Sequence, residues 1–204
     1  MNMIKIVTDS TADLPSSLVA ELNITVVPCL VHFGRETFRD GVDLNRREFY
    51  ARLAASDELP TTSAPGAGVF AAVYRDLLQD AEEVVSLHLA SSLSAVYNSA
   101  CLGAEMVDPS RITVLDTQQV SMGLGWLVIM AARAARAGMK AQQIVTLVQQ
   151  AIPRARVLAA LDTLKYLQRG GRVSRVVAMV GALLRVKPIL EVREGEVLLA
   201  ERVR

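Results

Sequence analysis

The sequence predicts an α/β fold in which a mostly parallel sheet is flanked by helices and is followed by a second, smaller α/β domain. Short apolar runs rich in β-branched residues alternate with longer segments that carry apolar residues at helical spacing. This alternation is typical of a parallel sheet covered on both faces. The chain has 204 residues and 51% of them are hydrophobic, so it can bury a large core.

Four apolar runs are the predicted strands of the parallel sheet: residues 4–7, 24–33, 84–89 and 112–115. The predicted helices begin near Leu14-Pro15 or cover residues 46–55, 70–78, 91–106, 121–137 and 140–152. Thr62 or Ser63 is the expected N-cap of the helix at 70–78, since Ser and Thr are favoured at that position.

The chain divides into two predicted domains, residues 1–153 and residues 154–204, with Pro153-Arg154 at the boundary. The second is expected to hold a strand at 157–161, a helix at 174–184 and a hairpin turning at Glu194-Gly195. The last strand pattern, residues 197–200, leaves an uncovered edge. We therefore expect this domain to be incomplete or to pair that edge with another chain, as in a homo-oligomer.

Composition excludes several classes of protein. A net charge of +1 and an aromatic content of 4% argue against nucleic-acid binding, which favours basic stripes and stacking rings. Asp9 comes too early for a signal peptide, and the longest apolar run, residues 122–132, is shorter than the ~20 residues of a membrane span. We expect a cytoplasmic protein. Cys29 and Cys101 lack metal-ligand spacing and are expected to be small buried hydrophobes.

Small hydroxyl residues follow three of the predicted strands or loops, at residues 8–11, 61–63 and 91–94. Turns of this kind meet at the carboxyl ends of parallel strands, where ligands bind. Helix N-termini there offer free backbone N–H groups and a partial positive charge. Three such turns could hold one oxyanion, whereas each turn taken alone is also explained by helix capping.

The sequence supports a catalytic site less well than a site that binds an anion. His32 and His88, the only histidines, lie in apolar strand-like runs and are expected to be ordinary strand residues rather than members of a Ser-His-Asp triad. Asp9 and Ser10 are similar to a phosphoryl-transfer or hydrolase nucleophile turn. That chemistry needs a second carboxylate two residues after the first, where Thr11 stands. Although this carboxylate is missing, an enzyme that uses Asp9 and Ser10 is kept as the alternative to a binding protein.

A Gly-rich turn with arginines precedes the predicted helix at 174–184. Gly170 and Gly171 stand between Arg169 and Arg172. The simpler interpretation is a tight turn with solvated arginines. In the functional alternative, the glycines let the backbone approach a ligand, and Arg172 points at its charged head.

Five ordered blocks together resemble the DegV family of fatty-acid-binding proteins. They are residues 7–15 (VTDSTADLP), 60–65 (PTTSAP), 91–100 (SSLSAVYNSA), 116–125 with Asp116-Thr117 and SMGLG, and 164–174 running into GALL and KPIL. The resemblance implies a two-domain carrier with an acyl chain in a tunnel. Its carboxylate would be gripped by Thr62 and by a serine of the 91–94 turn, Ser94 or else Ser91.

The same resemblance implies that the chain is not an enzyme and needs no cofactor or metal. Family members pass the fatty acid to a separate fatty acid kinase, so this chain would be a binding subunit. Burying a tail gains ~0.8 kcal/mol per methylene, while a buried carboxylate needs several donors. Two positions depart from the family, since Ala64 replaces Gln and Ala95 replaces Gly. The family pattern also continues past Arg204, which implies a truncated second domain with weakened lipid retention or one completed by another chain.

Overall fold

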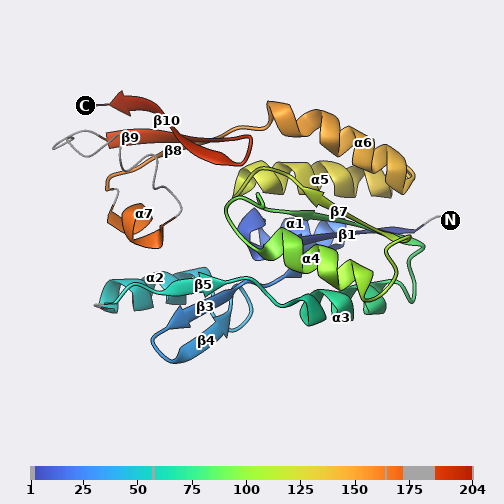
Figure 1. The fold of residues 1–204 in the computed structure, drawn as a ribbon, viewed down its shortest axis with the longest axis horizontal. Coiled ribbons are helices and arrows are strands. Elements are labelled where there is room, and N and C mark those ends of the chain that lie inside the picture. Colours follow the sequence, from blue (N-terminus) through green and yellow to red (C-terminus); the bar gives the residue numbers. More distant parts are fainter. Residues whose placement is uncertain (1–2, 57, 164, 172–186, 204) are drawn as a thin grey trace.

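A computed structural model describes residues 3–56, 58–163, 165–171 and 187–203. Its centre is a four-stranded parallel sheet in the order β2-β1-β6-β7. The strands are β1 (Ile4–Asp9), β2 (Ile24–Val27), β6 (Glu83–His88) and β7 (Ile112–Asp116). Figure 1 shows α5 (Met122–Arg136) and α6 (Ala141–Ala151) on one face and α3 (Ala67–Leu77) and α4 (Val96–Glu105) on the other. The predicted parallel sheet flanked by helices is therefore confirmed.

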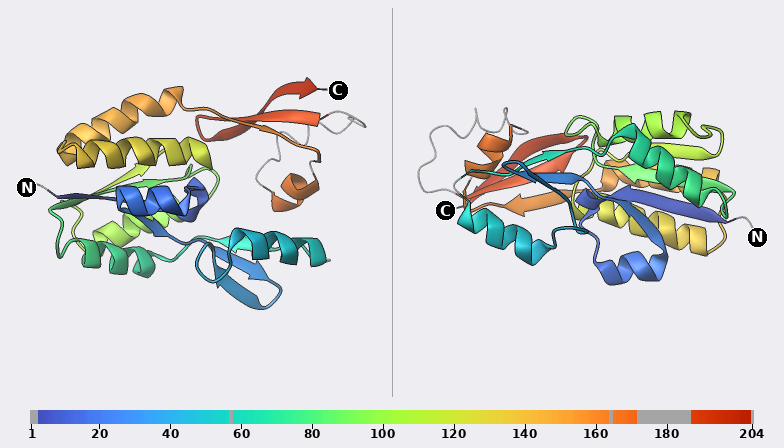
Figure 2. Two further views of the ribbon diagram at one scale, coloured as in Figure 1. Left: turned by 180° about the vertical axis from the view of Figure 1, so that it is seen from behind. Right: turned by 90° about the horizontal axis from the view of Figure 1, so that it is seen from below.

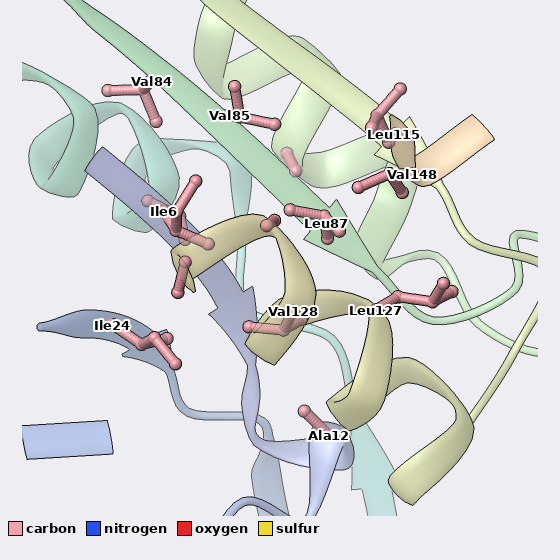
Figure 3. Close-up of a cluster of buried hydrophobic side chains, with 14 of the residues drawn as sticks. Ile6, Ala12, Ile24, Val84, Val85, Leu87, Leu115, Leu127, Val128 and Val148 are labelled. Atoms are coloured by element: carbon pink, nitrogen blue, oxygen red, sulfur yellow. The ribbon is translucent and has the colours of Figure 1, made fainter. Parts of the chain in front are cut away.

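The core lies between this sheet and its helices. Val7, Val85 and Leu87 are fully buried in the two central strands, which fits the continuous apolar character of strands covered on both faces. Figure 3 shows side chains of β1, β6 and β7 packed with Leu127 and Val128 of α5. The register pairs Ile6 with Val85. Burial of these β-branched and leucine side chains holds the central strands together and so fixes where their carboxyl ends lie.

The predicted strand at 24–33 is wrong, because it is two strands in different sheets. β2 pairs with β1, whereas β3 (Leu30–Phe33) joins the antiparallel sheet β4-β3-β5. Pro28 has no N–H to give to a ladder, and the N–H of Cys29 donates to the Ser10 hydroxyl at 3.1 Å instead. The chain therefore leaves the parallel sheet at these two residues.

The smaller sheet completes a lobe at one end of the molecule. It contains β4 (Glu36–Arg39) and β5 (Thr61–Ser63), and α2 (Arg46–Ala55) packs beside it. Residues 61–63 are predicted to form a turn, but they pair with β3 as a strand, with Thr62 opposite Val31. In Figures 1 and 2 this lobe lies near the carboxyl ends of the parallel strands.

α1 (Ser16–Leu22) begins just after Pro15, as predicted, and a one-turn 3-10 helix, η1 (Ser10–Ala12), precedes it with Asp9 as its N-cap. Two other helix starts differ from the predictions. The N-cap of α3 is Gly66, not Thr62 or Ser63, and the N-cap of α4 is Ala95. The hydroxyl residues at 61–63 and 91–94 therefore stand before these helices and do not occupy their N-cap positions.

The last described segment forms a third sheet. It contains β8 (Val157–Ala160), β9 (Lys187–Arg193) and β10 (Glu196–Val203) in the antiparallel order β10-β9-β8, with the short α7 (Lys165–Gly170) nearby. The predicted hairpin turning at Glu194-Gly195 is confirmed. The predicted helix at 174–184 lies outside the described residues. The domain boundary at residues 153 and 154 and the pairing of the β10 edge with another chain stay predictions. Within the described ranges, no helix is both long and apolar enough to cross a membrane.

Candidate functional site

A cavity of about 740 Å³ opens beside the carboxyl ends of β1 and β2, within the size range of small-molecule sites. Its walls come from η1, α1, β3, α2 and β5. The apolar lining includes Leu14, Pro15, Val19, Val26, Pro28, Val31, Val42, Phe49 and Tyr50. The polar lining includes Asp9, Ser10, Asp13, Asp40, Arg46 and Thr62. The cavity thus combines a mostly apolar wall with a few charged and hydroxyl groups.

Thr62 is the predicted site residue that the structure places on this wall. The register of β5 puts it opposite Val31, which also lines the cavity. The side chain is exposed, and its hydroxyl has no hydrogen-bond partner among the described residues. It is therefore available to a ligand.

Asp9 is fully buried at the end of β1 and organises the adjoining turn. Its carboxylate accepts hydrogen bonds from the N–H of Thr11 at 3.1 Å and from the N–H of Leu89 at 3.3 Å. It also accepts from Nδ1 of His88 at 2.9 Å and from the hydroxyl of Thr11. A carboxylate held by four donors is a poor nucleophile. The hydroxyl of Ser10, its partner in the alternative enzyme, already accepts from the N–H of Cys29.

A chain of buried hydrogen bonds continues from Asp9 into the core. The Tyr74 hydroxyl donates to Ser86 at 2.8 Å, so the Ser86 hydroxyl is free to donate to Nε2 of His88 at 2.7 Å. His88 then presents Nδ1–H to Asp9, a consistent neutral tautomer. Burial raises the pKa of Tyr74 above its ordinary value, which keeps its hydroxyl protonated and donating.

These contacts have the connectivity of a Ser-His-Asp triad, which the sequence analysis did not find. His88 is a buried strand residue, as expected. Its meeting with Asp9 was missed because only the pairing of β1 with β6 brings the two side chains together. Ser86, His88 and Asp9 are each 0% exposed, so no substrate reaches the Ser86 hydroxyl. The chain of bonds is therefore structural.

The turn that carries Ser91 and Ser94 follows β6. The N–H of Ser91 lies 3.3 Å from both carboxylate oxygens of Asp116, and the Ser94 hydroxyl accepts a long hydrogen bond of 3.4 Å from the N–H of Val96. The Ser91 side chain is exposed and Ser94 is half-buried. Neither serine lines the 740 Å³ cavity. Arg172, the fourth predicted ligand-binding residue, lies outside the described residues.

The described residues give no support for a metal site. The described part of the chain contains no group of three or more His, Cys, Asp or Glu side chains that could hold an ion. Among the described residues that line the cavity, Arg46 is the cation, and it lies 3.3 Å from the carboxylate of Asp13.

The family model for DegV, described as an uncharacterised protein of the DegV family, matches residues 3–204. The chain belongs to the DegV family. A DegV domain-containing protein from Caldanaerobacter subterraneus is 40% identical over 204 residues, which cover 100% of this chain and 72% of that protein. One from Deinococcus radiodurans is 41% identical over 98% of this chain and 71% of its own.

Solved DegV structures share the fold of this DegV-family chain. A fatty-acid-binding DegV family protein from Thermus thermophilus superposes with a TM-score of 0.91 at 36% identity, covering 99% of this chain and 72% of its own. A stearic-acid-binding protein from Eubacterium ventriosum gives 0.91 at 30% identity, covering 99% and 71%. DegV from Bacillus subtilis, described as a fatty acid binding protein, gives 0.89 at 32% identity, covering 100% and 73%.

The two cysteines of this DegV-family chain differ in exposure. Cys29 is buried as expected, whereas Cys101 is half-buried, a partial correction. Burial, with a smaller contribution from Asp9, raises the pKa of the Cys29 thiol to about 12. At pH 8, roughly one Cys29 in 10⁴ is then a thiolate, the form that reacts.

We therefore expect a thiol reagent at pH 8 to label Cys101 quickly and Cys29 only after unfolding. The number of reactive thiols measured with a chromogenic disulfide should be one in native protein and two in denaturant. Cys29→Ser should keep the fast phase and Cys101→Ser should lose it. Equal labelling rates for both thiols in native protein would contradict the burial of Cys29.

Proposed function

We propose that this chain binds one long-chain fatty acid and presents it in the cytoplasm to a separate fatty acid kinase. The acyl chain would lie in the 740 Å³ cavity, and Thr62 with Ser94, assisted by Ser91 and Arg172, would hold the carboxylate. The observation that carries the proposal is a largely apolar cavity with a free threonine hydroxyl on its wall. The description of relatives at 30% identity or more as fatty-acid binders supports it.

The energetics favour this division between tail and head. Each methylene buried against the apolar wall gains ~0.8 kcal/mol. The carboxylates on the wall would repel a ligand head, although Asp13 is paired with Arg46 and with the Ser121 hydroxyl at 2.7 Å. A head bound by uncharged hydroxyls away from Asp9 and Asp13 avoids that repulsion.

Presentation to a kinase requires a carboxylate that a second protein can reach. Thr62 and Ser91 are exposed, so a head held by them would be accessible, whereas the triad-like Ser86 is closed to substrates. These facts favour a binding subunit over an enzyme that uses Asp9 and Ser10.

Bound lipid is the first test of this function. We expect solvent extraction of purified protein followed by mass spectrometry to yield about one fatty acid per chain, and delipidated protein to take up oleate or palmitate. Recovery of no stoichiometric fatty acid, together with no uptake of either acid, would refute the proposal. Phosphoesterase turnover that is lost in Asp9→Asn would favour the alternative enzyme.

Thr62→Ala and Ser94→Ala are each expected to weaken binding about 10- to 100-fold, because a hydrogen bond to a charged group is worth ~1.5–3 kcal/mol. Titration with a fluorescent fatty acid measures the effect. Thr61→Ala is the matched control, since neighbouring side chains on a strand point to opposite faces and Thr61 does not line the cavity. Affinity unchanged in both Thr62→Ala and Ser94→Ala would show that the head binds elsewhere.

A further inference from the structure

The tip of the β9–β10 hairpin docks on the loops that follow β6 and β7. The N–H of Gly195 donates to the carbonyl of Gln118 at 3.1 Å. The hydroxyl of Ser92 donates to the carbonyl of Gly195. Ser92 lies in the turn that carries Ser91 and Ser94, so a segment about 100 residues later in the sequence contacts the proposed head-group turn directly.

Glycine suits both the turn conformation and the close contact at residue 195. Gly195 has a φ of +77°, and a Cβ atom there would lie 2.9 Å from the Ser92 hydroxyl oxygen. Any other residue would strain the backbone and also push against the turn. The docked contact thus favours glycine here in addition to the hairpin turn.

The two loops beneath the hairpin are themselves joined. The carboxylate of Asp116 accepts from the N–H of Ser91 at 3.3 Å and from the N–H of Gln118 at 2.9 Å. The N–H of Ala90 donates to the carbonyl of Gln119 at 2.9 Å. Gly195 therefore closes a clasp of three segments: the Ser91–Ser94 turn, the loop at 116–119 and the hairpin tip.

We propose that Gly195 is a positioning residue, through which the C-terminal sheet holds the Ser91–Ser94 turn in its ligand-binding conformation. This inference rests on the proposed function, because the turn is taken to bind the carboxylate. A turn that is already ordered loses less conformational entropy when the ligand binds. Loosening it should act mainly on the rate at which the fatty acid leaves.

Gly195→Ala tests the clasp, with Gly138→Ala as its matched control. Gly138 has a similar φ of +82°, but a Cβ there would meet no atom within 4 Å. Both variants carry the strain of a positive φ, whereas only Gly195→Ala presses on the turn. Ser92→Ala, which only removes the hydroxyl, keeps the test available if Gly195→Ala folds poorly.

Two readouts separate positioning from general stability. In delipidated protein, Gly195→Ala and Ser92→Ala should raise amide hydrogen exchange at residues 89–95 by about tenfold, and Gly138→Ala should not. In loaded protein, the same two variants should release a fluorescent fatty acid about tenfold faster, with Gly138→Ala at the wild-type rate.

The outcomes distinguish this inference from the function on which it rests. Wild-type release rates in Gly195→Ala and Ser92→Ala, in a protein that does bind fatty acid, would overturn the positioning role and leave the proposed function intact. Unchanged exchange at residues 89–95 would overturn the clasp whether or not lipid binds. Failure of the wild-type protein to bind any fatty acid would overturn the proposed function, and the exchange experiment would still report on the contact.

Discussion

Replacement of His88 by alanine is expected to lower the free energy of unfolding by about 3–5 kcal/mol. The imidazole is fully buried between the carboxylate of Asp9 and the hydroxyl of Ser86. It also contacts the ring of Phe70 edge to face, with centroids 5.2 Å apart. Its loss leaves a cavity and removes a donor from a buried carboxylate. Typical domains have a free energy of unfolding of only about 5–15 kcal/mol, so this loss would remove a large part of it.

Urea denaturation at neutral pH measures this loss, and His32→Ala is the control. His32 is half-buried and bonds to Thr37 and Ser63 at 2.9 Å near the surface, so its replacement should cost less than about 1 kcal/mol. His88→Asn, which can still donate to Asp9, should recover part of the stability. Equal losses in the two alanine variants would show that the buried chain of bonds contributes little.

Gly125→Ala is expected to destabilise the protein by about 1–3 kcal/mol, although alanine favours helices. A Cβ on Gly125 in α5 would lie 2.6 Å from the carbonyl oxygen of Ala12, 3.1 Å from Sδ of Met122 and 3.3 Å from Cδ2 of Leu14. The methionine can move, whereas the backbone carbonyl cannot do so without shifting the turn at residues 10–13. Figure 3 shows Ala12 beside α5. That turn forms part of the cavity wall, so the cavity should change shape as well.

Gly68→Ala in α3 is the matched helical control, since a Cβ there would meet nothing within 4 Å. It should be neutral or slightly stabilising, because alanine is the better helix former. The two variants therefore differ in the sign of their effect on the urea midpoint. A Gly125→Ala protein as stable as the wild type would mean that α5 does not rest on the η1 turn as closely as described.

The strands and helices of the parallel sheet could be predicted because each carries its own local signal. Residues 84–89 (VVSLHL) are mostly apolar and predict a strand, and Gly138, with its left-handed backbone, marks the end of α5. Local signals misled at residues 24–33 and 61–63. Residues 24–33 look like one strand, and residues 61–63 look like a turn. In both cases the actual pairing depends on partners elsewhere in the chain.

The candidate site also has features that the sequence predicts and others that depend on tertiary structure. The hydroxyl turns and the ligand class they favour follow from residue types and from the resemblance they carry. Thr62 was foreseen as a binding residue from that resemblance, while its place on a cavity wall depends on the pairing of β5 with β3. No sequence signal pointed to the contact between Gly195 and Ser92, because the two residues are 103 positions apart.

The sequence by itself determined the fold class, the hairpin at Glu194-Gly195 and the hydroxyl turns at residues 8–11 and 91–94, since apolar periodicity and turn chemistry act over a few residues. Only the tertiary structure decided that Asp9 meets His88 and that Gly195 meets Ser92. Hydrogen bonds of this kind form between groups brought together by strand pairing and sheet docking. Residues far apart in the sequence become partners only when the fold brings them close together, and no local sequence pattern records this.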